Sequence, residues 1–70
     1  MMYDTKLRNI EASAEQNGYN TLIPASNMII VKEAAENTKF ATFLNEYVAR
    51  HEDLEITWTE NTAEITVNER

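Results

Sequence analysis

Apolar residues recur at helical spacing in the first part of the chain. They are separated by steps of four, three and four residues and are Tyr3, Leu7, Ile10 and Ala14. This spacing keeps them on one face of a 3.6-residue period. Asp4 or Thr5 can cap the start, and Gly18, the single glycine, stands where a left-handed residue commonly ends a helix. The pattern predicts a helix over 4–17.

Two short apolar runs lie on either side of the single proline. The first covers 19–23 and is rich in strand-forming residues. It ends at Pro24, which cannot donate a backbone hydrogen bond, so we expect this strand to lie at an edge or to end there. A turn is expected at 25–27. The four consecutive apolar residues of 28–31 then predict a strand that is buried on both faces, or at least central.

The segment 28–36 has a second interpretation. Its later part, Lys-Glu-Ala-Ala-Glu, favours helix, so one long helix starting at Met28 is the alternative. The run Ile-Ile-Val favours strand instead. We expect the change from strand to helix pattern near 32–37.

Helical spacing returns after residue 39. The repeated apolar positions are Phe40, Phe43, Leu44, Tyr47 and Val48, and they again share one face. Asn37 is a suitable N-cap, although an earlier start at Glu33 is the alternative. Arg50 and His51 fall in the last turn, where positive charge interacts favourably with the helix dipole.

The end of the chain alternates as a hairpin does. The apolar positions are Leu54, Ile56 and Trp58, followed by Ala63, Ile65 and Val67. Placing Trp58 opposite Ala63 brings all of them to one face, and a slip by one residue would send them to the wrong side. The loop has two residues, Glu60-Asn61, or four, 59–62. Because no glycine follows Asn61, we favour the longer loop.

The predicted fold class is α+β, with two helices packed on one face of a small antiparallel sheet in the order αββαββ. The 70 residues are expected to form a single compact domain. No apolar run approaches the roughly 18 residues of a membrane span. The first residues lack the basic and apolar regions of a signal peptide. We therefore expect a cytoplasmic protein without a membrane partner.

Charge is distributed unevenly along the chain. The first fifty residues carry a net charge of −1, whereas the last twenty carry −5 of the total of −6. Such a field repels phosphate backbones and attracts basic surfaces. No basic stripe is visible, so direct nucleic-acid binding is not expected.

Few residues suggest chemistry. His51, the single histidine, is a candidate general base or metal ligand beside Glu52 and Asp53, but a helix end is the simpler interpretation. Glu52, Asp53 and Glu55 are candidate Ca²⁺ ligands, although the central glycine of an EF-hand loop is missing. The chain has no cysteine and no glycine-rich loop. We therefore predict no enzyme activity, no catalytic residues, no metal site and no cofactor.

The outer face of the hairpin is the candidate binding surface. It offers threonines and carboxylates, and the predicted partner-binding residues are Glu52, Asp53, Glu55, Glu60 and Glu64. Carboxylates spaced by a strand can imitate nucleic-acid phosphates and occupy a basic groove. The alternative is an ordinary polar face of an antiparallel sheet.

Several large apolar residues have two interpretations. Trp58 alternates with core positions and is predicted to lie in the core rather than to act as an exposed binding anchor. We expect Tyr3, Tyr19 and Met28 to stay partly exposed. They are candidates for a dimer seam, since a chain of this size buries little surface alone.

The chain contains no family motif. The chain is short, acidic and free of cysteine, and its predicted fold is α+β. In these respects it resembles small inhibitors encoded by phages or mobile elements, including anti-CRISPR proteins and DNA-mimicking uracil-DNA glycosylase inhibitors. The resemblance is one of size, charge and plan, so no site residues are transferred from it. It implies a non-enzymatic inhibitor that blocks a basic nuclease or other nucleic-acid-binding protein in a host cytoplasm. The alternative is a small homodimeric structural or regulatory assembly protein.

Overall fold

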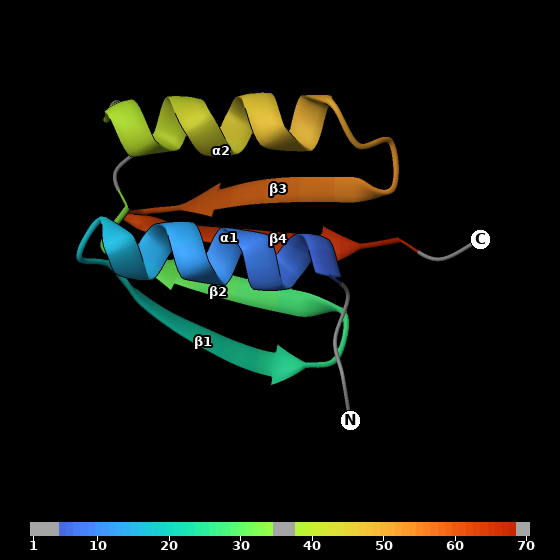
Figure 1. Ribbon diagram of the computed structural model, residues 1–70, viewed down its shortest axis with the longest axis horizontal. Helices are drawn as coiled ribbons and strands as arrows, with labels where there is room; N and C mark the ends of the chain where they lie inside the picture. Colours follow the sequence, from blue (N-terminus) through green and yellow to red (C-terminus); the bar gives the residue numbers. More distant parts are fainter. Residues whose placement is uncertain (1–4, 35–37, 69–70) are drawn as a thin grey trace.

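The computed structural model describes residues 5–34 and 38–68, and the elements within them form an α+β fold (Figure 1). The elements are, in chain order, α1 Thr5–Gln16, β1 Asn20–Ala25, β2 Met28–Lys32, α2 Lys39–Ala49, β3 Leu54–Thr59 and β4 Thr62–Val67. The predicted fold class and element order are therefore confirmed.

The strands form one antiparallel sheet with the order β1-β2-β4-β3. The last strand of the chain thus lies between β2 and β3, and β1 and β3 form the two edges. Alternate residues of the sheet pack with both helices into a single core, so α1 and α2 cover the same face. The central side chains of this core include Leu7, Ile10, Ile29, Leu44 and Ile65, all fully buried.

Helix α1 follows the predicted apolar stripe. Leu7, Ile10 and Ala14 are fully buried. Gly18 adopts φ 85°, as predicted for a residue that ends a helix, and the next amide, of Tyr19, donates to the Ala14 carbonyl at 2.9 Å. The predicted positions of Tyr3 and of an Asp4 cap lie outside the described residues.

The edge position predicted for the proline-containing strand is confirmed. Pro24 lies in β1, and the register with β2 shifts between Leu22 and Ala25. Strand β2 is central, as predicted, and it is a strand rather than the start of a long helix. Burial on both of its faces was a wrong expectation, since Ile29 and Val31 are buried but Met28 and Ile30 are only half-buried. Both helices lie on the other face of the sheet and leave this one uncovered.

Helix α2 begins after Thr38. The Thr38 hydroxyl oxygen accepts from the Ala41 amide at 3.1 Å and so caps the helix. The predicted cap Asn37 lies outside the described residues, and the alternative start at Glu33 is wrong, because Glu33 precedes the helix with φ 63°. The structure confirms that Phe40 and Leu44 face the core.

The predicted hairpin register is confirmed in full. Trp58 pairs with Ala63, Ile56 with Ile65 and Leu54 with Val67. The preference for a four-residue loop was wrong. Thr59 pairs with Thr62, so the loop is the two residues Glu60-Asn61. The tight turn forms without glycine because Glu60 itself adopts a positive φ of 53°.

We expect Glu60→Gly to stabilise the fold. A side chain at positive φ costs about 1–2 kcal/mol, and the added chain entropy of glycine offsets part of that cost. The net gain should be about 0.5–1 kcal/mol in the free energy of unfolding, measured by urea denaturation. The matched control Glu55→Gly, inside strand β3, should lower that free energy. A loss of stability in both variants would contradict the view that the positive φ of Glu60 is strained.

Candidate functional site

The sheet face opposite the helices forms the candidate binding surface, which we call the open face. Residues of neighbouring strands pair with one another and so form rows across this face. One row of paired residues runs Leu22, Ile30, Glu64 and Thr57 from β1 to β3. The neighbouring row runs Ala25, Met28, Thr66 and Glu55. The open face is therefore apolar at Leu22, Ile30 and Met28, polar at the end of β1 and β2 where Asn20 pairs with Lys32, and lined by carboxylates and threonines on β4 and β3.

Two of the predicted binding residues lie together on this face. Glu55 pairs with Thr66 and Glu64 pairs with Thr57, so the two carboxylates are diagonal neighbours. Diagonal positions in an antiparallel pair are about 7–8 Å apart, which lets one partner contact both. Glu55 is exposed and Glu64 is half-buried. Lys32, two residues beyond Ile30 on β2, places a positive charge on the same face.

The other predicted binding residues lie at the ends of the hairpin. Glu60 is in the β3–β4 loop, whereas Glu52 and Asp53 form the turn before β3. The six residues of β3 separate these ends, a distance of about 20 Å at 3.3 Å per residue. The five acids are therefore spread along the hairpin and do not form one cluster.

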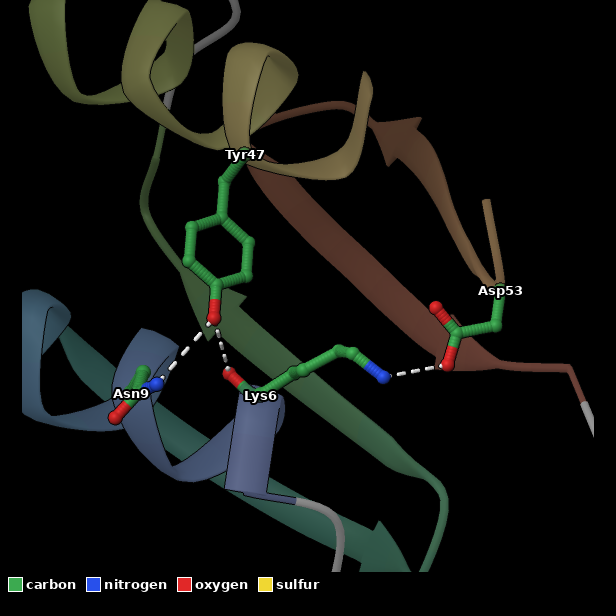
Figure 2. A network of polar contacts seen from close by, with 4 residues as sticks. All are labelled: Lys6, Asn9, Tyr47 and Asp53. Atoms are coloured by element: carbon green, nitrogen blue, oxygen red, sulfur yellow. Dashed lines mark hydrogen bonds and ion pairs between the residues drawn. The ribbon is translucent and has the colours of Figure 1, made fainter. Parts of the chain in front are cut away.

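Asp53 is the one of these five acids that forms an ion pair within the described part of the chain. Lys6 Nζ on α1 lies 2.7 Å from Asp53 Oδ2, and Figure 2 shows this ion pair joining α1 to the turn before β3. The hydrogen bond from Lys6 lowers the pKa of Asp53 below its usual value, and a backbone hydrogen bond and the charges of Lys6 and His51 act in the same direction. The structure thus gives Asp53 a role in joining two elements.

Tyr47 links α2 to α1. Its hydroxyl donates to the Lys6 carbonyl at 3.4 Å and accepts from Asn9 Nδ2 at 3.5 Å (Figure 2). It also belongs to a row of neighbouring rings along α2. The rings are Tyr19, Phe40, Phe43, Tyr47 and His51, with centroid separations of 4.7, 5.5, 5.9 and 4.7 Å in that order. Sequence reasoning found the apolar face of α2 but not this row, although steps of three and four residues from Phe40 to His51 signal it.

His51 lies just beyond α2, at the helix end that the simpler interpretation proposed. The helix ends at Ala49 with Arg50 as its C-cap, so the prediction that Arg50 and His51 fall in its last turn is wrong. The His51 amide donates to the Val48 carbonyl at 3.1 Å, and its ring packs on Tyr47. A hollow of about 540 Å³ beside it is lined by Lys6, Arg50, His51, Glu52 and Asp53. Within residues 5–34 and 38–68, no group of three or more His, Asp or Glu side chains is placed to hold a metal ion.

A second hollow lies between the two helices. It has a volume of about 240 Å³ and is lined by Ser13, Asn17, Lys39, Phe40 and Phe43. These side chains offer apolar contact, an ammonium group and neutral hydrogen-bonding groups. Among the described residues that line it, none carries a carboxylate or imidazole that could act as a base toward the Ser13 hydroxyl.

Trp58 packs against the core beneath α2, as predicted, but it is only half-buried because β3 is an edge strand. Its Nε1 donates to Asn45 Oδ1 at 3.1 Å. Tyr19 and Met28 are partly exposed as expected, and Tyr3 lies outside the described residues. Sequence reasoning missed the exposed large apolar residues Leu22 and Phe43, which are 49% and 38% exposed.

Comparison with known proteins adds no assignment: no family model, curated protein or solved structure matches this chain. Neither of the helices in the described part of the chain is long and apolar enough to cross a membrane.

Replacing Lys6 with methionine should raise the pKa of Asp53 toward its usual value. The folded-state pKa of Asp53 is lowered, so its stabilising contribution is present above the unfolded pKa of about 3.9 and is lost as the pH falls through the folded pKa. In Lys6→Met, less stability should be lost over this acidic range. Carboxyl ¹³C NMR titration of Asp53 measures the shift. Lys39→Met, which removes a charge from the far end of α2, should leave the Asp53 titration in place. An unchanged pKa in Lys6→Met would show that the ion pair does not form in solution.

Proposed function

We propose that this protein is a non-enzymatic acidic binding module that presents the β3–β4 hairpin to a basic protein. The partner is a nuclease or another nucleic-acid-binding protein, and the hairpin occupies its basic groove. The observation that carries the proposal is the pair Glu55 and Glu64, which share the open face of the sheet. Glu60 and Glu52 extend the same charge to the two ends of the hairpin.

The electrostatics of the whole chain support this function. Of the net charge of −6, −5 falls on the last twenty residues, which include the hairpin. A surface of one sign accelerates encounter with an oppositely charged partner and disfavours nucleic acid itself. Asp53 contributes less to this field, because Lys6 compensates its charge. The acids available to a partner are therefore Glu52, Glu55, Glu60 and Glu64.

We infer that the protein inhibits its partner by occupying the partner's basic groove. A basic groove filled by the hairpin is closed to DNA or RNA, and no bond needs to be made or broken. We infer an inhibitor of the kind that phages and mobile elements encode, acting in the host cytoplasm. Its potency would depend on how closely the carboxylates match the cations of the groove.

Salt dependence tests the proposal. The protein is used to capture a partner from a bacterial lysate, and the purified partner is then titrated at increasing salt and against competing DNA. The affinity should fall steeply, because the Debye length shrinks from about 10 Å at 0.1 M salt to about 3 Å at 1 M. DNA should displace the protein from its partner. An affinity that is flat with salt and unaffected by DNA would refute the proposed function.

A further inference from the structure

The open face carries apolar side chains that the core does not use. Leu22 on β1 is 49% exposed, and it pairs directly with the half-buried Ile30 on β2. Met28, also half-buried, lies two residues before Ile30 on the same face. We call these three residues the apolar half of the open face. In Figure 1, β1 and β2 lie side by side at the sheet edge farthest from α2.

The apolar half is continuous with the carboxylates. Ile30 pairs with Glu64 on the neighbouring strand β4, and adjacent strands are about 4.8 Å apart. One row of the sheet therefore changes from Leu22 and Ile30 to Glu64 within a single strand spacing. A partner that contacts Glu55 and Glu64 together meets Ile30 at the border of the same surface.

A second copy of the chain is a poor occupant for this face. Three side chains, two of them half-buried, expose far less than the roughly 800 Å² per partner of a standard interface. The nearby carboxylates and the net charge of −6 also repel a second copy. A cationic partner with apolar side chains of its own could contact both the apolar half and the neighbouring carboxylates.

We propose that the binding surface is the whole open face and that its partner is a segment with apolar side chains beside lysine or arginine. The apolar side chains cover Leu22, Ile30 and Met28, and the cations lie over Glu64 and Glu55. This inference rests on the proposed function and extends it, because a plain phosphate mimic needs no apolar contact. Binding then has two parts: ion pairs, which salt screens, and apolar burial, which salt does not weaken.

The test uses a display library of random linear peptides selected on the folded protein. Selected peptides should combine lysine or arginine with leucine, isoleucine or phenylalanine. Leu22→Thr keeps a good strand former at an exposed edge position, and it should weaken these peptides by about tenfold at every salt concentration. The double variant Glu55→Gln/Glu64→Gln should instead flatten the dependence of affinity on salt. Far-UV circular dichroism confirms that each variant is folded.

The matched control is Phe43→Gln. It removes the second exposed large apolar side chain of the described residues, which lines the hollow between the helices, and it should leave peptide affinity unchanged. Peptides that are basic only and indifferent to Leu22→Thr would overturn this inference and leave the proposed function standing. Peptides without cations, whose binding ignores salt and the glutamine variant, would overturn the proposed function as well. Selection that yields no peptide sensitive to Leu22→Thr, or only peptides sensitive to Phe43→Gln, would also overturn the inference.

Discussion

Reversing the charges of Glu55 and Glu64 to lysine should abolish most partner binding while the protein stays folded. Both side chains lie on the open face, away from the core. Each change replaces an attraction to a basic groove by a repulsion. We expect a loss of about 3 kcal/mol or more in binding free energy, which is over a hundredfold in Kd. Isothermal titration calorimetry on the captured partner measures the loss.

The control for this double variant makes the same change in net charge elsewhere. Glu15 on α1 and Glu46 on α2 are both exposed on the helical side of the molecule, so Glu15→Lys/Glu46→Lys should cost far less binding. Equal losses in the two double variants would show that only the total charge matters. A larger loss in the helix variant would place the binding surface on the helices instead. Because Glu64 is half-buried, the neutral variant Glu64→Gln separates a binding effect from a folding effect.

The second large effect is on stability. Ile65 is fully buried in β4, between β2 and β3, and packs in the core under the helices. Ile65→Ala should lower the free energy of unfolding by about 2–5 kcal/mol, through lost apolar burial and the cavity left behind. A domain of this size has a total stability of only about 4–10 kcal/mol. The variant should therefore be largely unfolded near 37 °C, as thermal denaturation followed by circular dichroism would show.

Ile30→Ala is the matched control on the opposite face of the sheet. Ile30 lies on β2, next to β4, but it is half-buried and faces away from the helices. The same deletion there should cost no more than about 1 kcal/mol, because most of the side chain is not enclosed by a core. Similar losses at Ile30 and Ile65 would mean that the open face is covered in solution. That result would favour self-association of the chain over the binding of a basic partner.

The local pattern of the sequence was sufficient for the elements and for the hairpin register. Helical spacing and strand alternation each require only that one side of a segment be buried, whatever buries it. The alternation of Trp58 and Ile56 with Glu55 also placed the carboxylates of β3 on the side away from the core. Gly18 ended α1 as predicted, because its positive φ is a local property of the backbone. The wrong loop length came from a local rule too, since the paired hairpin holds Glu60 at a positive φ that glycine usually adopts.

The candidate surface was only partly predictable. The alternation of side chains along the two strands predicted that Glu55 and Glu64 share one face, and the structure adds that they are diagonal neighbours. The pairing of Asp53 with Lys6 links residues 47 positions apart in the chain, and no local pattern encodes such a contact. The apolar half around Leu22 was missed for a similar reason. A run of apolar residues predicts burial on both faces, but the number of layers in the fold decides whether a second face is covered.

The sequence by itself determined which segments are helix or strand, which side of each segment faces a core, and where the negative charge lies along the chain. The tertiary structure alone decided the strand order β1-β2-β4-β3, with the last strand placed in the interior of the sheet. The prediction that both helices cover one face came from the sequence, whereas the tertiary structure added that Leu22 and Ile30 lie on the opposite face beside Glu64. The physical reason is the distance along the chain over which each pattern carries information. Periodicity reports the burial of a segment within a few residues, whereas strand order and uncovered faces depend on which distant segments pair, and many pairings satisfy the same local pattern.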